Sequence, residues 1–210
     1  MIPSEPSVGG GHAYGGVPRL AVYLSGGGRT LLNLHDEILA GRLRATIELV
    51  VASRQCAGAE RARARGLRTM VIQGVIPRGD NAALLRECGI DWVILAGYLK
   101  LFQIPTEYAG RVVNIHPALL PKFGGPGMYG HHVHEAVLRA GESESGCTVH
   151  LCDDEFDKGR ILLQRRCPVL PGDTPDTLAA RVFACETEAY PRALRELFVA
   201  GAPIRPGVKP

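Results

Sequence analysis

The chain of 210 residues lies within the usual size of one domain, and 46% of its residues are hydrophobic while 21% are charged. This composition supplies a full core and excludes wholesale disorder, and no apolar run reaches the roughly 18–20 residues of a membrane span. The formal net charge of +3 is too small for the broad basic surface that nonspecific nucleic-acid binding needs. We therefore expect a soluble protein without nucleic-acid or membrane partners.

Both ends of the chain lack hydrophobic periodicity. Residues 1–18 are rich in Gly, Pro and Ser, so we predict a flexible tail there and a second one over residues 200–210, on either side of one domain at residues 19–199. The first residues lack the basic region and apolar stretch of a secretory signal. The six cysteines include no Cys-x-x-Cys pair, which favours free thiols in the cytoplasm over disulfides or a zinc site.

Short apolar runs alternate with helix-like segments in the first half of the domain. The predicted strands cover residues 19–25, 47–53, 68–72 and 91–97. The predicted helices, each closed by a glycine, cover residues 30–41, 56–66 and 81–89. Apolar strands that alternate with helices predict a Rossmann-like α/β fold, in which a mainly parallel sheet has helices on both faces.

The second half of the domain departs from this alternation. Its predicted strands cover residues 111–116, 147–152 and 160–169, and its predicted helices cover residues 131–141 and 175–199. Only an acidic turn separates the last two strands, which predicts an antiparallel hairpin and makes the sheet mixed. Thr174 is a candidate N-cap of the last helix, with Pro175 at the first helical position.

A glycine-rich turn from Ser25 to Thr30 joins the first predicted strand to the first helix. Glycines let backbone N–H groups approach an anion, and the helix N-terminus adds a favourable dipole. The side chains of Arg29 and Thr30 can add hydrogen bonds to a phosphate. A dinucleotide fingerprint would need glycine in place of Leu31, and no Walker motif follows, so the turn favours a compact monophosphate. The alternative is a tight turn that binds no ligand.

A polar pair, Asn114 and His116, ends an apolar strand and is followed by Pro117. Residues two apart in a strand point to the same face, and the carboxyl ends of strands form the ligand crevice of open α/β sheets. An amide donor and an imidazole that titrates near pH 7 suit the stabilisation of an oxyanion. We therefore predict that the catalytic centre lies here, and the alternative is a structural histidine.

The acidic turn at residues 153–159 is the second candidate for chemistry. One of its carboxylates is expected to pair with His116, raise its pKa and orient its ring, although the spacing does not choose which one. The alternative is a solvated turn, as most acidic runs are. Four further histidines lack metal-ligand spacing, so no metal site is expected from His131, His132, His134 and His150.

Four stretches of the sequence carry a family resemblance: residues 114–123, 146–150, 154–159 and 180–191. They resemble the folate-dependent formyltransferase family, which is marked by Asn-x-His-Pro with Asp-x-Gly further along the chain. The His-Val-His of residues 132–134 and the early Ser-Gly-x-Gly turn favour the branch that acts on glycinamide ribonucleotide. The resemblance implies the formyltransferase fold and formyl transfer from 10-formyltetrahydrofolate to the amine of glycinamide ribonucleotide in purine synthesis.

The resemblance also implies a role for each matched residue. Asn114 and His116 would hold the formyl oxygen, with His116 as proton donor and Asp157 as the partner that keeps it protonated. The residues implied to surround the folate are Leu99, Lys100, Leu101, Phe102, Asn114, Asp153, Asp154, Glu155, Phe156 and Asp157. The residues implied to bind the phosphorylated amine are Gly28, Arg29 and Thr30 at its phosphate, and Phe183, Ala184, Cys185 and Glu186 at its ribose. Of the ribose set, Glu186 is the expected direct contact.

Three places depart from the family pattern. Arg29 and Thr30 stand where the family turn has Ser and Asn, and an arginine can still bind a phosphate. The segment 73–81 is shortened, which leaves Arg78 as a candidate contact to the folate. Thr187 stands where His is common. The implied partners are small molecules, and we expect a monomer or a homodimer.

Three alternative functions remain open. A formyltransferase of the same family that acts on a nucleotide-linked amino sugar would keep the same catalytic residues. A formyltetrahydrofolate hydrolase would use water and would carry an additional N-terminal domain, for which an 18-residue tail is too short. A noncatalytic phosphate-binding module would not depend on His116.

Overall fold

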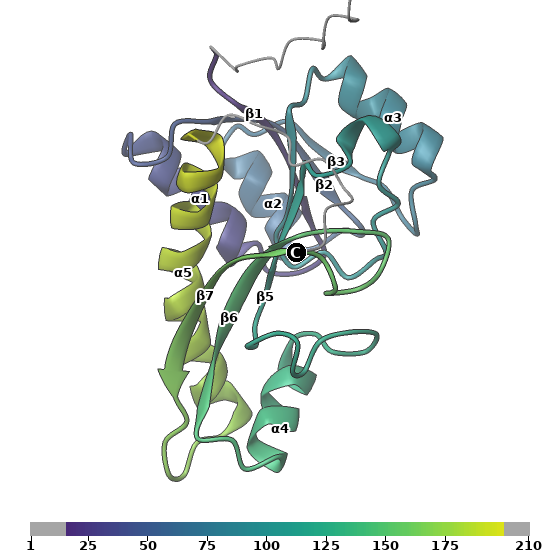
Figure 1. The fold of residues 1–210 in the computed structure, drawn as a ribbon. Coiled ribbons are helices and arrows are strands. Elements are labelled where there is room, and N and C mark those ends of the chain that lie inside the picture. The colour runs from purple at the N-terminus through teal and green to yellow at the C-terminus, as the bar shows by residue number, and fades with distance from the viewer. Residues whose placement is uncertain (1–15, 200–210) are drawn as a thin grey trace, which may run out of the picture.

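The computed structural model describes residues 16–199, so the predicted tails lie outside the described residues except for residues 16–18. Figure 1 shows helices packed along one sheet, with the last helix, α5 (Pro175–Val199), beside β6 and β7. Within the described range, no helix is both long enough and apolar enough to cross a membrane.

The described part of the chain forms a seven-stranded sheet in the order β3-β2-β1-β4-β5-β6-β7. Its strands are β1 (Arg19–Leu24), β2 (Thr46–Ala52), β3 (Thr69–Val71), β4 (Trp92–Leu95), β5 (Val112–His116), β6 (Glu144–Leu151) and β7 (Ile161–Pro168). The pairs among β1 to β5 are parallel, whereas β6 is antiparallel to both β5 and β7. The predicted Rossmann-like α/β fold with a mainly parallel mixed sheet is therefore confirmed.

The helices follow the predicted order. They are α1 (Arg29–Leu39), α2 (Ala57–Ala64), α3 (Arg78–Glu87), α4 (His131–Arg139) and α5, with a short 3-10 turn, η1 (Thr106–Tyr108), that was not predicted. The prediction for α3 was wrong at its start, because the helix begins at Arg78, with Pro77 as its N-cap, rather than at Asn81. A proline at this boundary costs little, since the first N–H groups of a helix need no helical partner.

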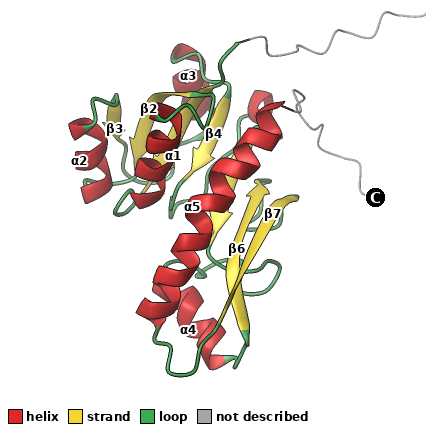
Figure 2. Cartoon of the chain, turned by 90° about the vertical axis from the view of Figure 1, so that its left-hand side faces the viewer, coloured by secondary structure: helices red, strands yellow, loops and turns green. Residues whose placement is uncertain are grey.

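The sheet separates two hydrophobic cores. Along β1, Leu20 and Val22 face one core while Ala21 and Tyr23 face the other, as the two-residue period of a strand requires. Helices α1, α2 and α5 cover the first face of the sheet (Figure 2), and α3 with residues 102–108 covers the second.

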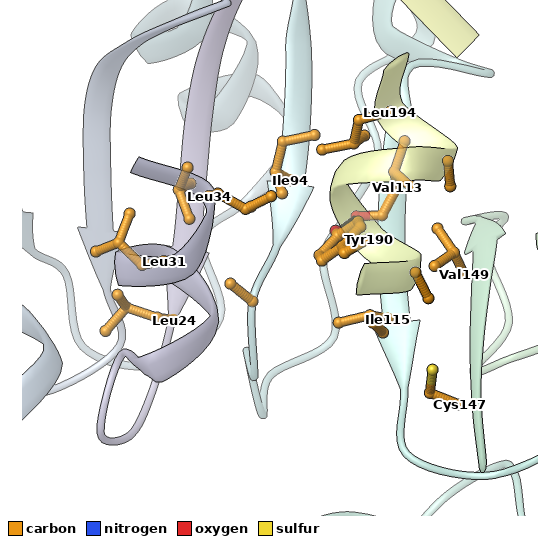
Figure 3. Packing of buried hydrophobic residues seen from close by; sticks show 14 of the residues in the cluster. Leu24, Leu31, Leu34, Ile94, Val113, Ile115, Cys147, Val149, Tyr190 and Leu194 are labelled. Carbon is orange, nitrogen blue, oxygen red and sulfur yellow. Dashed lines mark hydrogen bonds between the residues drawn. The ribbon is translucent and has the colours of Figure 1, made fainter. Parts of the chain in front are cut away.

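Tyr190 fastens α5 to the middle of the sheet. Its side chain is fully buried, and its hydroxyl lies 3.0 Å from the Leu95 carbonyl oxygen and 2.9 Å from that of Val113. Figure 3 shows the ring packed among Val113, Ile115 and Leu194. The hydroxyl thus links the helix to the last residue of β4 and to the second residue of β5, which fixes α5 against the middle of the sheet.

The start of α5 is capped as the sequence predicts. The Thr177 N–H donates to Oγ1 of Thr174 over 3.2 Å, and Pro175 is the first helical residue. Asp173, just before the cap, accepts a hydrogen bond of 2.9 Å from the guanidinium of Arg181, eight residues further along the chain.

The sheet order reverses between β1 and β4. The chain runs outward from β1 to β3 on one side and from β4 to β7 on the other. In open α/β sheets, ligands bind outside the carboxyl ends of the strands at such a reversal. The fold therefore points to the loops that follow β1, β4 and β5.

Candidate active site

A cavity of about 520 Å³ opens at the carboxyl ends of β1, β4 and β5, and its size is typical of small-molecule sites. Helix α5 contributes Ala179, Phe183 and Glu186 to its wall. The loops that line it are residues 26–30 after β1, 95–102 after β4, 114–117 after β5, 125–131 before α4, and 152, 153 and 155–157 after β6.

The side chains of Asn114 and His116 line the cavity, and they lie on the same face of β5 as Val112. The antiparallel pairing of β5 and β6 sets Asn114 directly across from His150. Nδ2 of Asn114 lies 3.1 Å from Nε2 of His150, whose Nδ1 lies 3.0 Å from the Leu151 carbonyl oxygen. Since a carbonyl only accepts, this geometry places a proton on Nδ1 of His150, and in the neutral ring Nε2 can then accept from Asn114.

His116 lies between a backbone carbonyl and a carboxylate. Its ring is 4% exposed, Nε2 lies 2.7 Å from the Phe123 carbonyl oxygen, and Nδ1 lies 3.5 Å from Oδ2 of Asp157. Burial lowers the pKa of His116 below its ordinary value, while the Asp157 carboxylate and the Phe123 carbonyl oppose this effect. Asp157 thus favours the protonated ring, as expected, but burial outweighs its effect.

Asp157 is the carboxylate of the acidic turn that reaches Asn114 and His116. Oδ2 accepts the Gly125 N–H over 2.9 Å, and Oδ1 lies 3.5 Å from both Nε2 of His150 and Nδ2 of Asn114. Burial raises the pKa of Asp157, but His150, His116 and the Gly125 N–H together hold it below its usual range. The carboxylate is therefore ionised at neutral pH.

A buried serine, Ser25, holds the start of the glycine-rich turn after β1. Oγ of Ser25 accepts the Leu99 N–H over 2.9 Å and lies 2.7 Å from Oγ of Ser53. In the part of the chain that the structure describes, the backbone N–H groups of residues 26–30 donate no hydrogen bond. They are available to an anion at the N-terminus of α1.

The same turn packs directly on the start of α2. Gly28 has a φ of +73°, and a Cβ built on it would lie 2.7 Å from the Cα of Gly58. The Arg61 guanidinium donates to the Gly27 carbonyl oxygen over 2.7 Å. Glycine at both contact positions therefore gives the turn its shape.

An arginine and an aromatic ring meet beside this turn. The guanidinium carbon of Arg29 lies 4.1 Å from the centroid of the Phe183 ring, and both residues line the cavity with Glu186. Burial raises the pKa of Glu186 to about 7, and the charge of Arg29 opposes that rise. This end of the cavity thus combines free N–H groups, a cation and a half-buried carboxyl group.

Comparison with known proteins places the chain in a family. A family model described as "Formyl transferase" matches residues 18–194. The chain belongs to the formyl transferase family. The chloroplastic phosphoribosylglycinamide formyltransferase of Arabidopsis thaliana is 42% identical over 185 residues, which cover 82% of this chain and 62% of that relative. The phosphoribosylglycinamide formyltransferase of Escherichia coli is 35% identical over 181 residues, which cover 82% of this chain and 83% of that protein.

This formyl transferase chain spans about three fifths of the length of the plant relatives it matches. Among solved structures, glycinamide ribonucleotide transformylase 1 from Symbiobacterium toebii has a TM-score of 0.80 at 35% identity, covering 88% of this chain and 89% of that chain. A formyltetrahydrofolate deformylase from Pseudomonas syringae pv. tomato, with a TM-score of 0.78 at 22% identity over 89% of this chain and 63% of that chain, shares the fold. The resemblance drawn from the sequence is confirmed at the level of the family.

The formyl transferase cavity gathers most of the residues that the sequence singled out. Those that line it are Gly28, Arg29, Thr30, Leu99, Lys100, Leu101, Phe102, Asn114, His116, Asp153, Glu155, Phe156, Asp157, Phe183 and Glu186. The glycine-rich turn and the acidic turn, 125 residues apart at Gly28 and Asp153, thus border one space.

Three residues of the predicted set, Asp154, Ala184 and Cys185, do not line this cavity. Ala184 is exposed, whereas Cys185 is buried with its Sγ 3.8 Å from the Arg166 carbonyl oxygen. Residues next to each other in a helix point in different directions, so neither shares the cavity face of α5. Asp154 turns away from the cavity and pairs with Arg78 over 3.1 Å, beside a second, smaller hollow.

Sequence reasoning missed two histidines of the formyl transferase cavity. His150 was considered only as a metal ligand, although the predicted hairpin set it on a strand beside Asn114. His134, on α4, is 4% exposed with Nδ1 buried and unpartnered, and burial lowers its pKa to about 4. Among residues 16–199, no group of three or more His, Cys, Asp or Glu side chains is arranged to hold a metal ion.

Proposed function

We propose that this formyl transferase moves a formyl group from 10-formyltetrahydrofolate to the amine of glycinamide ribonucleotide, a step of purine synthesis. The observation that carries the proposal is the cluster of Asn114, His116 and Asp157 in the wall of a cavity with one anion-binding end. The names of the relatives, phosphoribosylglycinamide formyltransferase and glycinamide ribonucleotide transformylase, support this choice of donor and acceptor.

The folate would occupy the end of the cavity between the segment after β4 and the acidic turn. Leu99, Leu101 and Phe156 line this end, and all three are large apolar side chains that are exposed. Exposed apolar groups around a hollow mark a site that an apolar ring system covers on binding.

The phosphorylated amine would occupy the opposite end. Its phosphate would accept hydrogen bonds from the free N–H groups of residues 26–30 and from the Arg29 guanidinium. Glu186, half-buried on α5, would accept a hydrogen bond from a ribose hydroxyl. The amine then reaches the middle of the cavity, where Asn114 and His116 lie.

In the reaction, the amine nitrogen forms a bond to the formyl carbon, and the carbonyl electron pair moves to the formyl oxygen. The formyl group is carried on an aryl amine and is already activated, so orientation and oxyanion stabilisation suffice. One N–H of the Asn114 amide binds His150, and the other, which reaches Oδ1 of Asp157 over 3.5 Å, would turn to the oxyanion. The second donor is the Nε2–H of His116. The Phe123 carbonyl accepts this N–H in the structure, so the formyl oxygen would compete with that carbonyl for it.

Collapse of the tetrahedral intermediate breaks the bond from the formyl carbon to N10 of the folate. The amine loses one proton and N10 gains one, so the proton count is balanced within the site. His116 is the group placed to carry this proton, because the Asp157 carboxylate beside it stabilises the imidazolium.

The test is an assay with 10-formyltetrahydrofolate and glycinamide ribonucleotide, in which the formylated product is detected by mass. We expect turnover that requires both substrates. Turnover with a nucleotide-linked amino sugar in place of glycinamide ribonucleotide would move the assignment to that alternative acceptor. Release of formate without any amine would indicate a hydrolase instead.

The cellular compartment is also part of the proposal, and we place the protein in the cytoplasm. All six cysteines, which lie in the described residues, are free thiols, as is usual in a reducing compartment such as the cytoplasm. The partners we propose are the two small-molecule substrates.

A further inference from the structure

The Arg29 side chain has an unusual partner. Arg29 is the first residue of α1, and its guanidinium lies 4.1 Å from the centroid of the Phe183 ring on α5. Over residues 16–199, no hydrogen bond or ion pair uses this guanidinium, so its N–H donors remain available. An exposed arginine would otherwise sample many rotamers, and contact with an aromatic face restricts it.

A neutral ring suits an arginine that has to bind an anion. A carboxylate partner would fix the guanidinium equally well, but it would neutralise the charge and compete with the incoming ligand. Glu186 lies one helical turn from Phe183 on the same wall, yet no ion pair joins it to Arg29 within 4.0 Å in the described structure. The ring therefore holds the cation without occupying its hydrogen-bonding edge.

We infer that Phe183 is a positioning residue, which holds the Arg29 guanidinium against the glycine-rich turn so that it binds the phosphate monoester of the amine substrate. This inference rests on the proposed function and adds to it a residue of α5 that contributes to specificity for the phosphate.

The rival explanation is that Phe183 contacts the ribose directly, or that it only stabilises α5. The explanations differ in one respect. If Phe183 acts through Arg29, its substitution has no effect on phosphate binding once Arg29 is gone. If it contacts the ribose or only packs, the effect persists without Arg29.

The experiment is a double-mutant cycle with Phe183→Leu, Arg29→Ala and the double variant. The probe is ribose 5-phosphate, a phosphate monoester without the amine, and its dissociation constant is measured by calorimetry. Given the usual strength of a cation–π contact at an exposed site, Phe183→Leu should raise this constant roughly two- to fivefold in the wild-type background. In the Arg29→Ala background we expect no further change.

Two controls complete the design. Phe183→Tyr retains an aromatic face and should keep the dissociation constant of the wild type. Phe198→Leu removes a ring that packs on Trp92 elsewhere on α5, and it should also leave the constant unchanged. In the formylation assay, Phe183→Leu should raise KM for the phosphorylated amine with kcat unchanged.

Equal loss from Phe183→Leu with and without Arg29 would overturn the inference, as would a wild type that does not bind ribose 5-phosphate. The binding cycle needs no turnover. Failure of the formylation assay would therefore count against the proposed function, whereas the binding cycle would still test whether Phe183 acts through Arg29.

Discussion

Asn114 lies directly opposite His150 in the antiparallel pairing of β5 and β6, with Nδ2 of the amide 3.1 Å from Nε2 of the ring. The ring accepts one amide N–H, because its own proton is held by a backbone carbonyl. The amide orientation is therefore set by the neighbouring strand, and its second N–H is directed by default toward the cavity and the carboxylate there.

Replacing His150 tests this arrangement. His150→Leu removes the acceptor, so the Asn114 amide should lose its fixed orientation and kcat should fall about tenfold, less than the roughly 100-fold typical for loss of an oxyanion donor. His150→Gln keeps an acceptor oxygen and should recover part of the loss. Steady-state kinetics and thermal unfolding should be measured together. Equal kcat in all three proteins would contradict the positioning role.

The pairing of His116 with Asp157 leads to a second prediction. His116→Gln and Asp157→Asn, both close in volume to the native residues, should each lower kcat at least about 100-fold with small changes in KM. Asp157→Asn also removes a charge that raises the pKa of His116, so the pKa of this ring should fall further below its ordinary value. Kinetics and an NMR titration of the imidazole measure the two effects separately.

Asp154→Asn is the matched control, since Asp154 belongs to the same turn but pairs with Arg78 outside the cavity. It should leave kcat within about threefold of the wild type, the size of change expected when no transition-state contact is lost. Activity retained in both His116→Gln and Asp157→Asn would reject the mechanism.

The contrast between Asp157 and Asp154 shows what the sequence could and could not predict. Strand–helix alternation predicted the sheet, and the polar strand end predicted Asn114 and His116, because both depend on local periodicity. The choice among the carboxylates of one turn depends on backbone geometry: Asp157 has a φ of +57° and receives the Gly125 N–H. Neither feature has a sequence period, and only the family resemblance singled out Asp157.

The ribose-side residues illustrate the same limit on α5. The matched residues 183–186 were predicted together, but a helix turns only one face to a cavity. Phe183 and Glu186 therefore line the cavity, whereas Ala184 and Cys185 do not. The Arg29–Phe183 contact joins residues 154 positions apart and depends on the docking of α5.

Gly58 offers a third prediction, on the shape of the glycine-rich turn. A Cβ at this position would lie 2.6 Å from the Gly26 carbonyl oxygen and 2.9 Å from Cδ1 of Leu24. Gly58→Ala should therefore destabilise the protein by about 1–3 kcal/mol, as overpacking does, and raise KM for the phosphorylated amine. Denaturant unfolding and kinetics measure these effects.

Gly79→Ala is the control for the substitution at Gly58. Gly79 is also helical, but a Cβ there would meet nothing within 4 Å. Its replacement should be neutral or stabilise the protein by up to about 1 kcal/mol, because alanine loses less backbone entropy on folding. A Gly58→Ala variant as stable as Gly79→Ala would show that the turn accommodates the added methyl group without loss of stability.

His134 makes the protein sensitive to acid. Burial lowers its pKa in the folded protein to about 4, with His131 and His116 adding to the effect, against an ordinary value of 6.5. Between these two values the unfolded chain binds a proton at this residue that the folded protein does not. The free energy of unfolding should therefore fall as the pH falls from 6.5 to about 4, by up to about 3 kcal/mol from His134.

His134→Leu removes this titration, so its free energy of unfolding should decline less than that of the wild type over the same interval. Some decline should remain, because burial also lowers the pKa of His116. His132→Gln, which changes an exposed histidine of the same helix, should follow the wild type. Urea unfolding at pH 7, 5.5 and 4.5 makes the comparison. Parallel pH profiles for the wild type and His134→Leu would mean that the folded protein protonates His134 as readily as the unfolded chain does.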